Sequence, residues 1–140
     1  MNKELIFLPV MIQILLIFLL YVKLGAVKSK ALKQGLVDEA RRGLYDDAWP
    51  KQVLQINNAI TNQFQLPMLF FVMILVLWLL NSITVWAHFF AWLFVVGRIV
   101  HAYIHSGSND TPLRRNSFMV SCLFLLLITG HCFMSIFSSL

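Results

Sequence analysis

Four long apolar segments leave this chain few alternatives to a membrane fold. They cover residues 5–24, 60–81, 83–105 and 117–138. A helix that crosses the hydrocarbon core needs about 20 mainly apolar residues, and each segment meets that length. The composition agrees, because only 12% of the residues are charged, whereas a soluble domain carries about 25%. The sequence predicts an all-α integral membrane protein, with a bundle of four helices in one domain over residues 1–140.

The lysines and arginines are distributed unevenly over the connections between these segments. Nine of the eleven lie in residues 23–51 and 106–117, whereas the tight turn at residues 81–82 has none. The positive-inside rule therefore predicts that both basic connections are cytoplasmic and both termini are outside. Topology and contact with anionic lipids account for the net charge of +5. No repeated basic and aromatic pattern indicates nucleic-acid binding.

Polar amides accumulate where the second apolar segment begins. If its helix starts near residue 53, a rotation of about 100° per residue places Gln55, Asn58, Asn62 and Gln65 on one narrow face. An unpaired amide in hydrocarbon costs several kcal/mol, so this stripe must face protein, water or a ligand. Two interpretations follow: hydrogen bonds that join helices, or the wall of a binding site.

The third segment carries a second polar stripe, in which Arg98, His101 and His105 share one helix face. An arginine inside a membrane normally faces the bundle interior or a polar cavity, and the alternative is that it extends toward the interface. No Asp or Glu occurs between Asp47 and Asp110. Amides, histidines, a lipid headgroup or an anionic ligand remain as partners. The histidine spacing alone, without a nearby thiolate or carboxylate, predicts no metal site.

An antiparallel hairpin around the turn at residues 81–82 brings the two stripes to the same depth. The pairs expected to face each other are Gln65 with Arg98, Asn62 with His101, and Asn58 with His105. The result is a cleft of amides and imidazoles around a buried positive charge, open toward the cytoplasmic loops. Such a cleft favours an anion with many hydrogen-bonding groups.

Two sequence motifs resemble those of one membrane-protein family. NQFQLPMLFF resembles the second-helix signature N-x-F-E-x-P-x-L-F-[FY] of bacterial members of the MAPEG family (membrane-associated proteins in eicosanoid and glutathione metabolism). GRIVHAYIHSGSNDTPLRR resembles their third-helix R-x-x-H-[SA]-x-x-H segment and the following N-x-x-x-x-R loop. The resemblance covers essentially the whole chain. It implies a homotrimer in a bacterial inner membrane, with sites between neighbouring subunits near the cytoplasmic face. It also implies glutathione as the cofactor.

The resemblance also assigns roles to individual positions. Asn62 matches the motif asparagine, and Arg98 matches the third-helix arginine. Gln65 stands in place of the motif glutamate, so it can accept a hydrogen bond from the glutathione ammonium without pairing its charge. His101 and His105 stand where the glutathione-using enzymes have tyrosines. Asn58 joins these five as a predicted cofactor-binding residue.

Either Arg114 or Arg115 is the nearest counterpart of the arginine that stabilises the glutathione thiolate in the family, and both are predicted catalytic residues. The resemblance thus implies a glutathione-dependent transferase or peroxidase acting on a small lipophilic electrophile. Two alternatives remain: a non-catalytic trimer that binds a lipid or another anion between its subunits, and a purely structural or partner-binding bundle. The predicted partners are further copies of the chain, membrane lipids, and a lipophilic substrate or anionic ligand.

Overall fold

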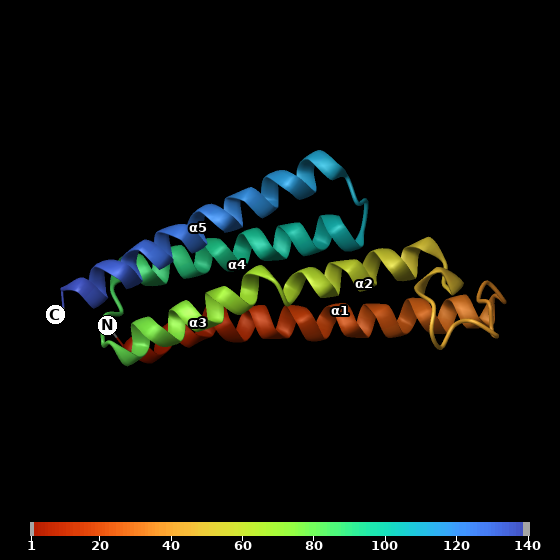
Figure 1. The fold of residues 1–140 in the computed structure, drawn as a ribbon, viewed down its shortest axis with the longest axis horizontal. Coiled ribbons are helices and arrows are strands. Elements are labelled where there is room, and N and C mark those ends of the chain that lie inside the picture. Colours follow the sequence, from red (N-terminus) through yellow and green to blue (C-terminus); the bar gives the residue numbers. More distant parts are fainter. Residues whose placement is uncertain (1, 139–140) are drawn as a thin grey trace.

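The computed structural model describes residues 2–138, which form a bundle of antiparallel helices (Figure 1). The first crossing is α1 (Phe7–Lys33), the second is divided into α2 (Lys51–Gln63) and α3 (Leu66–Leu79), and the third and fourth are α4 (Val85–Ser106) and α5 (Thr111–Phe137). Each of the four crossings is long and apolar enough to span a membrane. The expected all-α membrane bundle is therefore confirmed.

The helices alternate in direction, so the connections gather at two ends. Both termini lie beside the α3–α4 turn, and the other two connections lie at the opposite end (Figure 1). Short 3₁₀ turns, η1 (Lys3–Ile6) and η2 (Asp46–Ala48), precede α1 and α2. The α3–α4 turn is the tight turn expected at residues 81–82, and Asn81 adopts the left-handed conformation with φ 54°, which asparagine tolerates better than most residues.

Two apolar clusters hold the bundle together. One joins α3, α4 and α5, where Phe70 stacks on Phe94 with ring centroids 4.4 Å apart. The other joins α1, α2 and α4 around Leu20, Ile56 and Ala102. Large apolar side chains also cover the outside of the helices, as is required of a surface that contacts lipid tails rather than water.

Small residues let α5 approach α4 closely. A Cβ atom added to Gly97 on α4 would lie 2.6 Å from the Oγ of Ser121 on α5, which is closer than two such atoms can pack. Ser121 is itself fully buried, and its hydroxyl donates to the Ser117 carbonyl at 3.1 Å. This close contact is typical of helix packing in membranes, and it sets the position of the first turns of α5 relative to the histidines of α4.

The second crossing is not the continuous helix that the sequence analysis expected. The α-helical hydrogen bonds stop at Gln63, and Gln65 takes the non-helical angles φ −95° and ψ −93° before α3 begins. Pro67 causes the break, because it has no N–H to donate to the Gln63 carbonyl and its ring clashes with the preceding turn. The buried Gln63 side chain at the break accepts a 3.0 Å hydrogen bond from Gln13 of α1.

Two helices extend further than their apolar segments. Four lysines that were placed in the first connection lie on α1 instead, and Arg114 and Arg115, which were placed in the third connection, lie on α5. Helix α5 begins early because the Asp110 side chain accepts from the Leu113 N–H at 2.9 Å and Pro112 fits the first turn. Hydropathy marks the membrane-embedded part of a helix, whereas capping residues mark its end.

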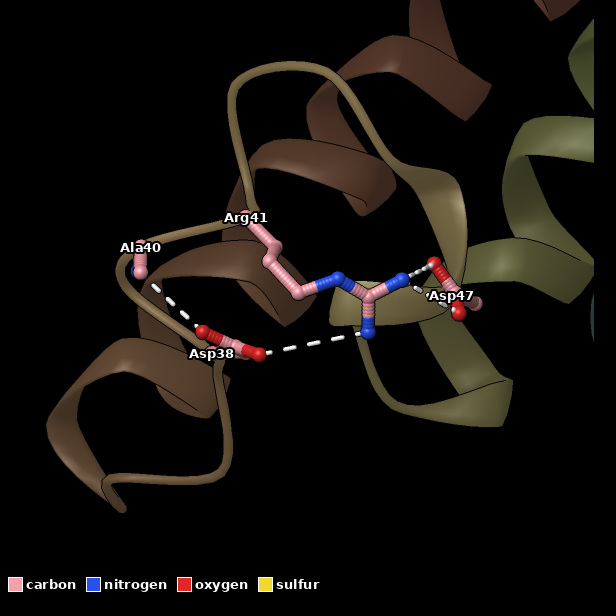
Figure 2. A network of polar contacts seen from close by, with 4 residues as sticks. All are labelled: Asp38, Ala40, Arg41 and Asp47. Carbon is pink, nitrogen blue, oxygen red and sulfur yellow. Dashed lines mark hydrogen bonds and ion pairs between the residues drawn. The ribbon is translucent and has the colours of Figure 1, made fainter.

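The connection between α1 and α2 is folded by ion pairs (Figure 2). Arg41 donates to both carboxylate oxygens of Asp47 at 2.9 Å and lies 4.0 Å from Asp38. The hydrogen bond that Arg41 donates to Asp47 raises the pKa of Arg41. Arg42 pairs with Glu39 at 2.8 Å. Because these charges neutralise one another, the unpaired positive charge at this end of the bundle comes mainly from α1 and α5.

Candidate functional site

A pocket of about 530 Å³ lies between α2, α4 and α5, beside the connection from α4 to α5. Its lining residues are Asn58, Asn62, His101, His105, Thr111, Arg114, Arg115 and Phe118. Six of the eight site residues expected from the sequence thus come together around one opening. The other two, Gln65 and Arg98, lie outside the lining.

Arg98 lies beneath the pocket and is fully buried. One terminal nitrogen, Nη2, donates to the Asn62 side-chain oxygen at 2.6 Å and to its backbone carbonyl at 3.2 Å. Within residues 2–138, neither Nε nor Nη1 has a hydrogen-bond partner, and the guanidinium lies 5.9 Å from the centre of the Phe118 ring. This burial excludes an arginine that extends to the lipid interface.

The two polar stripes meet in a register one helical turn away from the expected one. Arg98 contacts Asn62 rather than Gln65, and Gln55 reaches the end of α4. The α3–α4 connection explains the shift. Its residues 82–84 are not helical and Thr84 is extended, and an extended residue covers about twice the length of a helical one. Each α4 residue therefore lies further from the turn than a count of residues predicts.

Asn62 links the buried arginine to the surface of the bundle. A guanidinium can only donate, so the Asn62 oxygen faces Arg98 and its Nδ2 is left to donate. The acceptor is the exposed Gln65 side chain, 3.2 Å away. The helix break carries Gln65 off the pocket wall, and the three residues form a chain from the interior outward.

The two histidines line the pocket, and one nitrogen of each ring is buried and unpaired. His101 Nδ1 lies 2.9 Å from the Arg114 carbonyl, and because a carbonyl only accepts, Nδ1 carries the proton. Its Nε2 and the Nδ1 of His105 are buried without partners in the described part of the chain. The rings are 5.4 Å apart. Among the described residues, no group of three or more His, Cys, Asp or Glu has metal-binding geometry.

The two arginines of the pocket differ in how firmly they are held. Arg114 is half-buried, and its Nη1 donates to the Asn109 side chain. Asn109 adopts a left-handed φ of 56°, which fixes its side chain beside the start of α5. Arg115 is exposed, and no ion pair holds it within residues 2–138. Arg114 is thus pre-positioned, whereas Arg115 is free to move.

Two residues outside the predicted site set brace this site: Lys23, which the sequence analysis did not single out, and Gln55, which belongs to the predicted amide stripe. Lys23 of α1 donates to the backbone carbonyl and the hydroxyl of Ser106 at 2.8 and 2.9 Å. Gln55 of α2 donates to the carbonyls of His105 and Gly107 at 2.9 and 2.7 Å. Together they cap the C-terminus of α4, where a positive charge is also favoured by the helix dipole. The amide stripe indicated that Gln55 could join helices, whereas the position of Lys23 gives no signal for its contact, which depends on how the helices cross.

An apolar four-crossing bundle with a cationic pocket at one end defines an integral, multi-pass membrane protein in contact with lipid. The sequence profile of the MAPEG family matches residues 6–134. The chain therefore belongs to the MAPEG family, the membrane proteins of glutathione and eicosanoid metabolism, whose members generally use glutathione and are typically trimers. Comparison with curated proteins found no match, and comparison with solved structures found none either.

Proposed function

We propose that the pocket binds glutathione and stabilises its thiolate for attack on lipophilic electrophiles, as in a transferase or peroxidase. One observation carries this proposal: Arg114, Arg115 and two imidazoles line the same opening, and no carboxylate lines it with them. Glutathione with an ionised thiol has three negative groups and one ammonium. A cationic pocket of this kind favours that charge distribution.

Arg114 is the residue that we propose to face the thiolate. A nearby positive charge lowers the pKa of a thiol and so increases the thiolate fraction. Electrostatic stabilisation is strongest when the charged group is already in place before the reaction, and the contact with Asn109 holds Arg114 in that way. The buried charge of Arg98 adds to the field from below, because few water molecules screen it.

The remaining lining residues would bind the rest of the molecule. Asn58 and Asn62 offer amide groups to the peptide backbone of glutathione, and the imidazoles of His101 and His105 form the wall beside them. The glutathione ammonium would be bound least well, because Gln65 offers it only a neutral oxygen. Loss of charge pairing at a partly buried site costs roughly 1 kcal/mol or more.

This lack of an acid supports a second candidate function. A pocket with no carboxylate in its lining suits an anion without an ammonium, such as a lipid phosphate. In that case the chain would be a non-catalytic binding protein. The two candidates differ in whether glutathione is bound in preference to a simple phosphate.

A homotrimer completes the site in this proposal. Asn58, Thr61 and Gln65 are exposed on the same side of the second crossing. Exposed amides near hydrocarbon are costly unless another protein surface covers them. A neighbouring copy of the chain supplies that surface. We infer three copies because members of the family are typically trimers.

The decisive experiment is a titration of detergent-purified protein with glutathione, followed by thermal stability and by thiolate absorbance. We expect both signals in the wild type, a loss of thiolate absorbance in Arg114→Gln, and a smaller loss in Arg115→Gln. Arg41→Gln, which changes an arginine of the α1–α2 connection, is the matched control and should behave as the wild type. Stabilisation by an anionic phospholipid or inorganic phosphate but not by glutathione would favour the second candidate.

A further inference from the structure

A second polar pocket, of about 370 Å³, lies between the first residues of the chain and the end of α3. Its lining residues are Asn2, Lys3, Glu4, Trp78, Leu79 and Asn81. Lys3 and Glu4 belong to η1, and Asn81 stands in the turn that follows α3. This pocket shares no lining residue with the one proposed to bind glutathione, so its ligand is a separate question.

Two opposite charges line this pocket without pairing. Within residues 2–138, no ion pair includes Lys3 or Glu4, and the Glu4 carboxylate has no hydrogen-bond partner. The Lys3 ammonium donates to the Asn81 side-chain oxygen at 2.9 Å. Because an ammonium has three protons to donate, two remain for a ligand. The pocket therefore offers a cationic donor and an anionic acceptor together.

The charge at this end of the bundle sums to zero. Lys3 and Glu4 are the only Lys, Arg, Asp or Glu in residues 2–22, 64–97 and 116–138. Anionic lipids are attracted by clusters of lysine and arginine, which this chain carries at the opposite end. A pocket with one charge of each sign instead matches a ligand that also carries one of each.

The pocket lies at the level where lipid headgroups are found. Tryptophan side chains concentrate at the boundary between membrane and water, and the Trp78 ring packs against Phe7 with centroids 5.8 Å apart. Leu79 in the pocket lining and Leu75 one turn deeper are exposed, at 63% and 49%. Charged groups thus adjoin a surface that faces lipid tails, which is the arrangement that one whole phospholipid requires.

We infer that this pocket binds the headgroup of phosphatidylethanolamine, a phospholipid with one phosphate and one primary ammonium. Lys3 and the Asn81 Nδ2, which is left to donate because Oδ1 faces Lys3, bind the phosphate. Glu4 binds the ammonium. A primary ammonium donates charge-assisted hydrogen bonds to a carboxylate, whereas the trimethylated ammonium of phosphatidylcholine has no proton to donate. The inference does not rest on the proposed function.

Native mass spectrometry of the full chain in detergent tests the headgroup preference. The probes are phosphatidylethanolamine, phosphatidylcholine and phosphatidylglycerol with identical acyl chains. We expect the wild type to retain the ethanolamine lipid about threefold more than either other lipid, the scale of an exposed ion pair. Glu4→Gln should lower its retention to that of the choline lipid, and Lys3→Gln should lower both. Glu39→Gln, which removes an equal charge in the α1–α2 connection, is the matched control and should match the wild type.

Photolabelling locates the lipid and identifies its source. Phosphatidylethanolamine with a diazirine near the glycerol should label the first residues of the chain and the end of α3. Unlabelled phosphatidylethanolamine should protect them, whereas soluble phosphoethanolamine at the same concentration should not. Equal retention of the three lipids, unchanged retention in Glu4→Gln, or protection by soluble phosphoethanolamine would overturn the inference. Glutathione binding by Glu4→Gln should equal that of the wild type, so this site and the proposed function fail or stand separately.

Discussion

The Arg98 guanidinium and the Asn62 side-chain oxygen are 2.6 Å apart inside the bundle, and together they explain two costly residues in a membrane segment. The Asn62 oxygen accepts a hydrogen bond from the guanidinium, so each residue supplies a hydrogen-bond partner that the other needs. The pairing is incomplete, because Nε and Nη1 of Arg98 lack partners within residues 2–138. A buried charge that is only partly compensated is seldom retained for stability alone. We therefore expect the charge of Arg98 to contribute to ligand binding.

The first prediction uses a double-mutant cycle to separate the contribution of Arg98 to stability from its contribution to ligand binding. Arg98→Met keeps the volume and removes the charge, so the thermal midpoint should stay equal to or above that of the wild type, whereas glutathione affinity should fall. Asn62→Leu removes the only side chain within residues 2–138 that accepts a hydrogen bond from Arg98, and it should destabilise the protein by about 3 kcal/mol. The double variant should recover most of that loss. An Arg98→Met protein that binds glutathione normally would show that the arginine has no role in the site.

The second prediction concerns the cap on α4. Gln55→Leu leaves the carbonyls of His105 and Gly107 without their side-chain donor, which should cost about 1–3 kcal/mol. Because these carbonyls lie where α4 meets the connection to Arg114, glutathione binding should weaken as well. Gln52→Leu, an exposed glutamine one turn earlier on α2, serves as the control. Thermal unfolding and a glutathione titration of both variants provide the measurement, and equal behaviour would refute the bracing role.

The third prediction tests the close approach of α4 and α5. Gly97→Ala should destabilise the bundle by about 1–3 kcal/mol, the usual effect of overpacking, because the new Cβ meets Ser121 Oγ at 2.6 Å. Adding Ser121→Gly should restore most of the thermal midpoint. Gly25→Ala, where no atom lies within 4 Å of the added Cβ, should be neutral or slightly stabilising. Failure of Ser121→Gly to rescue would place the strain elsewhere.

The fourth prediction is the orientation in the membrane, which follows from the lysine and arginine asymmetry. Single cysteines are placed at Lys30, Arg115 and Ser138 in a protein that lacks its two native cysteines. The first two should react with an impermeant maleimide added on one side of the membrane, and the third with maleimide added on the other side. We expect the first two to be cytoplasmic and the third to be outside. Labelling of all three from one side would contradict the positive-inside assignment, and with it the proposal that the pocket faces the cytoplasm.

Much of the fold could be predicted from local sequence. A membrane core leaves backbone groups no partner except one another, so long apolar segments must become helices, and the tight turn at Asn81 forces α3 and α4 to be antiparallel. The same reasoning favoured an interior position for Arg98, because polar groups in hydrocarbon have few other places to go, and the structure buries it. The choice of residues for the pocket followed from this burial together with the family resemblance.

The tertiary structure decided which side chains on different helices contact each other, which local sequence rules do not specify. The depth at which Asn62 meets Arg98 depends on the extended residues of one turn, and the removal of Gln65 from the pocket wall depends on the break before Pro67. The bracing by Lys23 joins residues 83 positions apart. Periodicity specifies which face of a helix is polar, since rotation per residue is a local property. Which groups meet across two helices is set by their crossing, and that depends on the packing of the whole bundle.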